Sequence, residues 1–308
     1  MHSFRDFRKV ITMELRLLKY FLEAANELNI TRAAQRLHIT QPSLSRQIAD
    51  LEHEVGRKLF TRERFGIRLT EEGVLLKKRA QEIIGLEEKT LSELSGTNNE
   101  NIIGTVYIGA GETIGIKHIS RVLKKLRTDH NGIRYRMISG DSEDVSDKLE
   151  KGLVDFGLFI GRTGIHISSS YNYIALSDSD VWGVVVRSDD TLAGKAGVTP
   201  DDLKGRELLF SYQAKTQGEF SEWLGYSFDE LDIIGTYNLA YNSSVMVREG
   251  LGILVTIDGI VSTGGESGLK FIPLTPELKA GLVLAWKKSA VFSKAALKFL
   301  EYFKASLA

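Results

Sequence analysis

Residues 31–55 restrict the fold of this chain most, because they encode two short helices separated by a tight turn. Thr31 can cap a helix over residues 32–37, and Thr40 can cap a longer helix that follows the turn. Pro42 falls in the first turn of that longer helix, where its missing N–H costs no hydrogen bond. The pattern therefore predicts a compact pair of helices joined by a turn.

The longer helix has an apolar face and a slim polar face. Leu44, Ile48, Leu51 and Val55 share one side at helical spacing, and the opposite side carries hydroxyls, one Gln and one Arg. A slim polar face can approach base edges, where Gln pairs with adenine and Arg with guanine. This arrangement predicts a DNA-binding helix-turn-helix. The helix residues expected to contact DNA are Thr40, Gln41, Pro42, Ser43, Ser45 and Arg46.

A short hairpin is expected directly after these helices. Residues 61–69 have the pattern of two short strands around a turn at residues 64–66, which corresponds to the wing of a winged helix-turn-helix. Arg62, Arg64 and Arg68 alternate along it and can contact phosphates. The alternative is an ordinary solvated surface hairpin. Its position beside the predicted recognition helix favours a DNA contact, for which Arg62 and Arg64 are the wing candidates.

Charge is divided unevenly between the two ends of the chain. The 308 residues contain 40 basic and 40 acidic side chains, a balance that by itself argues against a nucleic-acid binder. Residues 1–68, however, hold 13 basic and eight acidic side chains, a net charge of +5, which leaves −5 on the remainder. The zero total therefore hides a basic head on an acidic body.

Several classes of protein are disfavoured by what the composition lacks. There is no cysteine, which excludes disulfides, thiolate metal sites and thiol redox sensing, and no two histidines have the i, i+4 spacing of a helical metal pair. We expect neither a metal nor another cofactor. No apolar run reaches the length of a membrane helix, and the basic N-terminus is not followed by an apolar signal segment. A cytoplasmic location without membrane association is expected.

A long helix and a polar segment follow the predicted wing. Thr70 can cap a proline-free helix that extends to about Ser95, with apolar residues near heptad spacing, interrupted by Glu87. Packing on its own domain is one interpretation. Dimerisation is the favoured one, because a helix-turn-helix protein usually reads two half-sites as a twofold dimer. Residues 96–101 are polar and turn-rich and mark the best domain boundary.

From Thr105 onward, strands and helices alternate as in a parallel α/β sheet, and a second series after about Asp178 suggests a second lobe. Ligands of such sheets bind beyond the carboxyl ends of the strands, so a cleft between the lobes is the expected pocket. The effector candidates at these strand ends are Gly111, Glu112, Thr113, Ser139, Asp141, Phe159, Ser211 and Asn242.

The chemistry of the expected effector is left open. Free N–H groups and the Thr113 hydroxyl near a helix N-terminus favour an anion such as a carboxylate, and Thr113 is the residue for which contact is preferred over a simple capping role. Glu112 argues against a purely anionic ligand and suggests an amine, or a side chain that faces solvent. For the other candidates, helix capping and ligand contact are equally compatible with the sequence.

The head resembles the DNA-binding domain of LysR-type transcriptional regulators. The resemblance rests on Ala33–Ala34, the run from Leu37 to Ile48, and the spaced positions that continue to Gly73, about twenty in all. Weaker resemblance to the effector domain lies in residues 152–158 and 249–253, although the proline that often follows the second segment is absent. Residues 1–12 depart from the family pattern, which leaves open whether Met1 or Met13 is the start.

The resemblance implies promoter DNA and a small-molecule effector as partners, and a homodimer or homotetramer paired through the linker helices. The expected fold class is α/β: a winged helix-turn-helix, a long linker helix, and a two-lobed effector domain similar to periplasmic solute-binding proteins. The predicted parts are an extension (1–12), a winged helix-turn-helix (13–70), a linker helix (71–95), a hinge (96–102) and an effector domain (103–308), with lobe 1 at about 103–177 and 281–308 and lobe 2 at about 178–280.

Other functions fit the sequence less well. Gly109, Gly111 and Gly115 follow a predicted strand, but their spacing misses the dinucleotide-binding fingerprint by one residue. There is no P-loop, no G-x-S-x-G and no H-E-x-x-H motif, so we do not expect an enzyme. An architectural DNA binder would not need a ligand-binding body of two hundred residues. An isolated solute-binding protein is excluded by the head and by the missing signal segment.

Overall fold

The computed structural model describes residues 13–94, 102–161, 170–214 and 218–307, and the chain divides into two compact units between Leu91 and Ser92. The predicted extension, and the predicted hinge apart from residue 102, lie outside the described residues. Each unit is described by itself. In the described part of the chain, no helix is both long and apolar enough to span a membrane.

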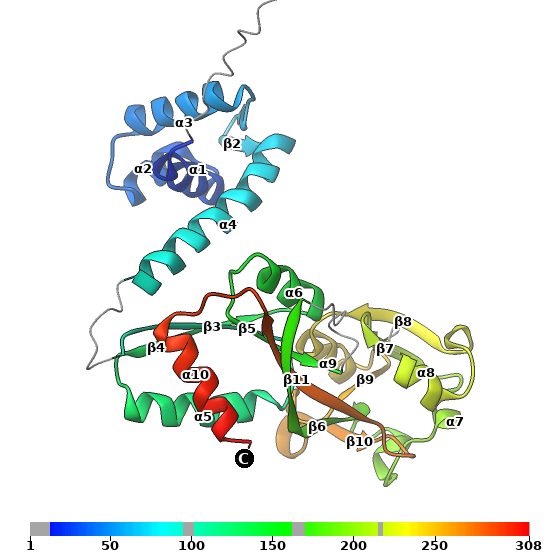
Figure 1. Ribbon diagram of the computed structural model, residues 1–308. Coiled ribbons are helices and arrows are strands. Elements are labelled where there is room, and N and C mark those ends of the chain that lie inside the picture. The colour runs from blue at the N-terminus through cyan, green and yellow to red at the C-terminus, as the bar shows by residue number, and fades with distance from the viewer. Residues whose placement is uncertain (1–12, 95–101, 162–169, 215–217, 308) are drawn as a thin grey trace, which may run out of the picture. The chain divides into compact units, whose positions relative to one another are not determined.

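The N-terminal unit is a three-helix core followed by a β-hairpin and a long helix (Figure 1). Its core is formed where the apolar faces of the first and third helices meet, with Phe21, Leu44 and Leu51 completely buried. Its elements are α1 (Leu15–Glu27), α2 (Ile30–Arg36), α3 (Gln41–Val55), β1 (Phe60–Glu63), β2 (Gly66–Leu69) and α4 (Glu71–Leu94).

The N-cap residues explain where α2 and α3 begin, and one of them differs from the residue predicted. The Thr40 hydroxyl accepts from the N–H of Ser43 at the start of α3, as predicted. The predicted cap at Thr31 is wrong: α2 begins at Ile30, and the Asn29 side chain accepts from the N–H of Arg32 at 3.0 Å. Asn29 is the cap because it lies in extended backbone just before the helix, whereas residue 31 is already helical.

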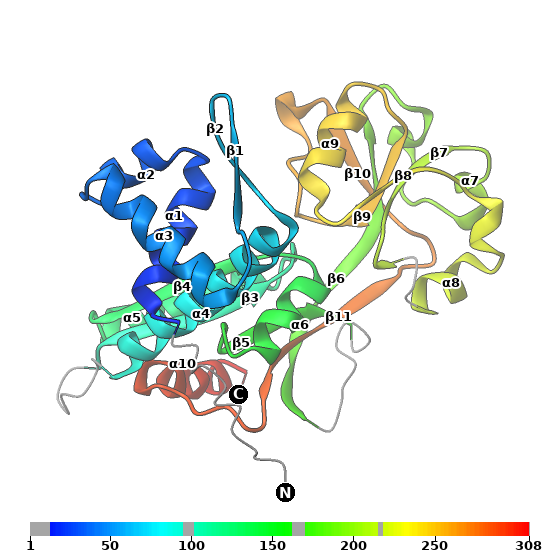
Figure 2. The same cartoon turned by 90° about the horizontal axis from the view of Figure 1, so that it is seen from above.

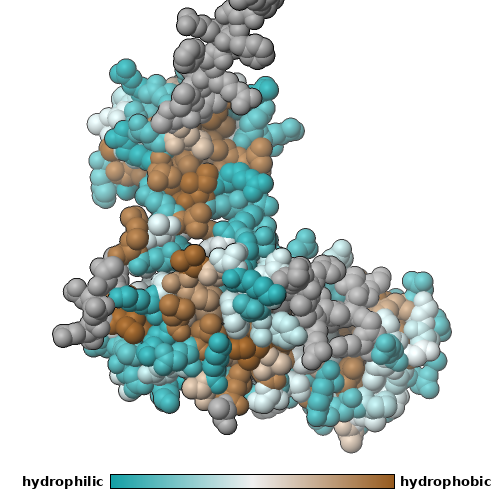
Figure 3. All heavy atoms as spheres, in the orientation of Figure 1, coloured by the Kyte–Doolittle hydropathy of each residue, from teal (hydrophilic) through white to brown (hydrophobic). Residues whose placement is uncertain are grey.

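The long helix α4 packs on its own unit along one side only. Leu76 lies against the core, Ala80 is completely buried and Ile84 nearly so, so the first part of the expected heptad pattern serves intradomain packing. Leu75 and Leu86 are exposed instead. Figure 3 shows hydrophobic surface, coloured brown, on the unit that carries this helix.

The C-terminal unit contains one continuous mixed sheet that passes through two lobes, in the order β4-β3-β5-β11-β6-β9-β7-β8, with β10 paired to β6. In the first lobe β3, β4 and β5 are parallel. Its elements are β3 (Gly104–Ala110), α5 (Ile116–Asp129), β4 (Ile133–Ser139), α6 (Ser142–Glu150), β5 (Phe156–Ile160) and α10 (Lys294–Ala305).

The second lobe has its own apolar core, which includes Phe210 and Val255. Its elements are η1 (Thr191–Gly194), α7 (Pro200–Leu203), β7 (Glu207–Ser211), α8 (Gly218–Leu224), η3 (Phe228–Glu230), β8 (Asp232–Tyr237), α9 (Ala240–Arg248), β9 (Ile253–Ile257), η4 (Gly265–Ser267) and β10 (Leu269–Pro273).

Two long antiparallel strands connect the lobes (Figure 2). These are β6 (Tyr171–Arg187) and β11 (Lys279–Lys287), which pair with each other on both sides of a register shift at Gly281–Val283. The first lobe uses the start of β6, and the second lobe pairs β9 with its later part. The second series was expected to begin after about Asp178, whereas β6 begins at Tyr171 and pairs in both lobes.

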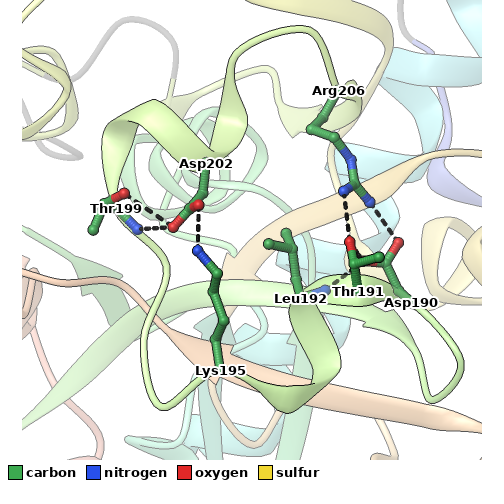
Figure 4. Close-up of polar contacts among 7 residues, drawn as sticks. All are labelled: Asp190, Thr191, Leu192, Lys195, Thr199, Asp202 and Arg206. Atoms are coloured by element: carbon green, nitrogen blue, oxygen red, sulfur yellow. Dashed lines mark hydrogen bonds and ion pairs between the residues drawn. The ribbon is translucent and has the colours of Figure 1, made fainter.

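The loop between η1 and β7 in the second lobe is held by ion pairs (Figure 4). Asp190 pairs with Arg206 at 2.5 Å, and Lys195 pairs with Asp202 at the same distance. Asp202 also accepts from the N–H and hydroxyl of Thr199, which completes a capping box on α7. These contacts fix the fold of the loop, and because they are partly exposed we assign them only a small stabilising effect.

Candidate DNA-binding surface and effector cleft

The first turn of α3 presents a polar surface. Gln41, Pro42 and Ser43 are exposed, and Ser45 is half-buried. The Gln41 side chain donates from Nε2 to Oγ of Ser45 at 2.8 Å, which restricts the rotamers of both. Arg46 is exposed and has no hydrogen bond or ion pair to any described residue. The face therefore offers an uncommitted guanidinium beside a pre-oriented amide, as base recognition requires.

The structure confirms the predicted hairpin, and Arg62 and Arg64 are both exposed on it. At its tip Phe65 is 86% exposed, and the guanidinium of Arg64 lies 5.3 Å from the centre of the Phe65 ring. Phe65 was not among the predicted contact residues, although it is a large apolar residue in the turn of a basic hairpin. The N–H of Ile67 donates to the carbonyl of Leu28 at 3.0 Å, which ties the wing to the end of α1.

The Glu52 side chain holds the segment that leads from α3 into the wing. Its carboxylate accepts from the N–H groups of Leu59 (2.8 Å) and Phe60 (3.3 Å) and from Nζ of Lys58 (2.6 Å). Burial acts to raise the pKa of Glu52, but these hydrogen bonds outweigh burial and hold the pKa below its ordinary value. An ionised Glu52 thus connects α3 to β1.

A cavity of about 80 Å³ lies between the two lobes of the C-terminal unit. It is reached by residues from the ends of β3, β4 and β5 in the first lobe and from the ends of β7, β8 and β9 in the second. Five of the eight predicted effector residues line it: Gly111, Glu112, Asp141, Phe159 and Ser211. Their contact with an effector remains a prediction.

Three predicted effector residues are not on the cavity wall. Thr113 is 4% exposed, and its hydroxyl accepts from the N–H of Gly115 at 3.0 Å, so here it acts as a local cap. Ser139 is exposed at the end of β4. Asn242 is exposed in the first turn of α9, because this helix begins at Ala240 and the position between strand and helix belongs to Asn238.

Several residues of the second lobe line the cavity but were not predicted from the sequence. Gln213, Tyr237 and Asn238 follow or end strands, which is the signal that could have found them. The Tyr237 hydroxyl donates to the carbonyl of Val255 at 2.7 Å. Burial raises the pKa of Tyr237, and the negative charge of Glu112 acts in the same direction. The carboxylate of Glu112 therefore faces this part of the second lobe.

A buried carboxylate lies in strand β6, near the start of α5. Asp180 is completely buried; its Oδ1 accepts from the N–H of Ile114 at 3.2 Å, and no described residue bonds to its Oδ2. Burial raises the pKa of Asp180 to about 6, against the opposite effects of hydrogen bonds from the Thr113 hydroxyl and the Ile114 N–H.

A winged helix-turn-helix with an exposed polar face on α3 and a two-lobed α/β domain with a cavity between its lobes together define a class of protein, the ligand-responsive transcriptional regulators. Sequence profiles agree with this assignment. Residues 15–74 match the family described as "Bacterial regulatory helix-turn-helix protein, lysR family", and residues 99–308 match "LysR substrate binding domain". The chain belongs to the LysR family of transcriptional regulators, a family of DNA-binding regulators, not of enzymes.

Individual relatives support the assignment to this family. The chain is 28% identical over 280 residues to the Hca operon transcriptional activator HcaR of Escherichia coli K12, covering 90% of this chain and 92% of HcaR. The fold is similar to that of the LysR-family regulator CbnR, with a TM-score of 0.76, 18% identity, and 96% and 100% of the two chains covered. CbnR bound to its target DNA gives a TM-score of 0.72 with 20% identity over the same shares of the two chains.

Proposed function

We propose that this regulator reads a promoter through the first turn of α3 and the wing. Thr40, Gln41, Pro42, Ser43, Ser45 and Arg46 approach the base edges, and Arg62 and Arg64 contact phosphates. The observation that carries this assignment is the slim polar face of α3, where Arg46 has no partner among the described residues. We also infer a cytoplasmic location, because the DNA target lies there.

The substitution Arg46→Ala tests this assignment. We expect the affinity for the specific promoter to fall by about tenfold or more at fixed salt, because one good bidentate base contact is lost. Arg134→Ala is the matched control, since it removes an exposed arginine from β4 in the other unit. Equal promoter affinity of the Arg46 variant and the control in a gel-shift assay would contradict the recognition-helix assignment.

We further propose that α4 pairs two copies of the chain. The apolar side chains of Leu75, Ile83 and Leu86 remain exposed, and their spacing places them on one side of the helix. A second copy is the expected occupant, because a twofold arrangement lets two recognition helices read two half-sites. The assembly is then a homodimer, or a homotetramer built from two such dimers.

Leu86→Asp tests the α4 interface. A charge in the apolar contact should lower the solution mass measured by light scattering to that of a smaller assembly, whereas Gln81→Asp, at an exposed polar position of the same helix, should not. An unchanged assembly for the Leu86 variant would exclude this face.

For the effector, we propose binding in the cavity between the lobes. Gly111, Glu112, Asp141, Phe159 and Ser211 are the predicted residues that line the cavity, and a bound molecule there touches both lobes. Such a ligand favours one lobe arrangement by its differential affinity for it, and the change alters how the paired DNA-binding units meet DNA.

Trp182 lines the same cavity and offers a direct assay. Compounds from a small-molecule screen that shift the melting temperature should also change tryptophan fluorescence, and should alter the promoter footprint. Compounds that stabilise the protein without affecting either fluorescence or footprint would place the effector site elsewhere.

A further inference from the structure

Glu112 spans the proposed effector cleft. It lies in the first lobe, two residues after the end of β3, and its Oε2 accepts a hydrogen bond from the N–H of Ala240, the first residue of α9 in the second lobe. Leu239, at the N-cap position of α9, provides no side-chain acceptor. Glu112 therefore supplies, from the opposite lobe, the anionic cap that the N-terminus of α9 lacks.

A second hydrogen bond crosses the cleft, and here the first lobe supplies the donor and the second lobe the acceptor. The N–H of Ser142, the first residue of α6 in the first lobe, donates to Oε1 of Gln213 in the second lobe at 3.3 Å. Helix N-termini are the groups that ordinarily hold a carboxylate ligand. At both of these helices, side chains of the protein itself already accept from the first N–H, so a carboxylate effector has to displace them.

The charge of the described cavity wall also disfavours a carboxylate effector. Glu112 and Asp141 are its charged residues, and none of its described residues is Lys, Arg or His. One oxygen of Asp141 accepts from the N–H of Asp144 at 2.9 Å. Much of the remaining wall is apolar, including Phe159 and Trp182. The wall thus combines carboxylates with an apolar surface, which suits a cationic head group on an apolar body.

We propose that Glu112 selects the effector: the cleft takes a small molecule that carries an ammonium group on an apolar body, and it discriminates against carboxylates. This inference rests on the proposed effector cleft. An ammonium pairs with the Glu112 carboxylate without breaking its bond to Ala240, because each carboxylate oxygen accepts more than one hydrogen bond. A carboxylate in the same place meets like charge in a partly dehydrated cavity.

Benzylamine and benzoate form a matched pair of probes with the same ring and opposite charge, and benzyl alcohol is the neutral reference. Titrations of the full-length protein are followed by tryptophan fluorescence at neutral pH and fixed ionic strength. We expect benzylamine to bind at least about tenfold more tightly than benzoate. Glu112→Gln, which keeps an acceptor for the Ala240 N–H, should remove this preference, whereas Glu143→Gln, at an exposed position of α6 outside the cavity wall, should keep it.

Glu112→Ser supplies a gain of binding that misfolding does not imitate. It releases the N-terminus of α9 and removes the charge, so benzoate should bind this variant at least about tenfold more tightly than it binds the wild type. Equal affinities of the wild type for benzoate and benzylamine, or a preference that survives in Glu112→Gln, would overturn the selection by Glu112 and leave the cleft intact. If none of the three probes binds any of these proteins while promoter binding is normal, the proposed effector cleft itself is refuted, and the inference with it.

Discussion

The buried carboxylate of Asp180 should make the stability of the C-terminal unit depend on pH. Its pKa is about 6 in the folded protein against an ordinary value of 3.8. At about 1.4 kcal/mol per pKa unit, this difference corresponds to about 3 kcal/mol. Because the folded pKa is raised, the folded state holds its proton to higher pH than the unfolded chain does. The contribution of Asp180 to stability is therefore greatest below about pH 4, falls as the pH rises to about 6, and is constant beyond that.

Asp180→Asn removes this titration. Comparing the variant with the wild type at two pH values cancels any pH-independent effect of the amide. Between about pH 4.5 and about pH 7.5, the variant should gain about 2 kcal/mol of unfolding free energy relative to the wild type. Asp178→Asn, an exposed carboxylate on the same strand, is the matched control and should show little such gain.

Urea unfolding followed by tryptophan fluorescence measures this difference in the intact chain. All three tryptophans (Trp182, Trp223 and Trp286) lie in the C-terminal unit, so the signal reports on that unit alone. A difference between variant and wild type that is the same at both pH values would refute the reasoning, because it would show that Asp180 does not titrate in this range.

Three further substitutions test other parts of the structure. Gly73→Ala places a Cβ 2.1 Å from the carbonyl oxygen of Leu59, so it should lower the melting temperature of the N-terminal unit in circular dichroism; an unchanged transition would contradict this close approach. Arg62→Ala should reduce the slope of log affinity against log salt for promoter DNA by about 0.9, and an unchanged slope would exclude a phosphate contact. Arg206→Ala should cost at most about 1 kcal/mol in urea unfolding, because its ion pair with Asp190 is partly exposed; a loss of several kcal/mol would show that the pair is structurally essential.

Local signals predicted the N-terminal unit well. The periodicity of Leu44, Ile48 and Leu51, the cap at Thr40 and the hairpin after α3 all involve residues close in sequence, and the structure confirms each of them. The wrong prediction of Thr31 as the cap of α2 also came from local signals. Asn29 and Thr31 both have capping side chains, and the choice between them depends on where the backbone becomes helical.

The cleft was predictable only in part. Gly111, Glu112 and Asp141 were found because they follow strands of the first lobe, where the α/β alternation is regular. Gln213 and Tyr237 were missed because their place on the cavity depends on strand order and register in the second lobe. Thr113 was expected to face a ligand, but it is buried, and its hydroxyl accepts from the N–H of Gly115. A hydrogen bond from this hydroxyl also acts to lower the pKa of Asp180, which is 67 positions away in the chain.

The sequence by itself determined the helix-turn-helix with its wing, the alternating α/β body and the membership of the LysR family, because these are encoded in local periodicity, caps and motif spacing. Only the tertiary structure decided which strand-end residues meet across the cleft. Glu112 reaches Ala240 and Gln213 reaches Ser142 because β6 and β11, which pass through both lobes, bring the two lobes together. Such contacts arise from packing between distant segments, and that packing turned Glu112 from an ambiguous loop residue into the proposed determinant of effector charge.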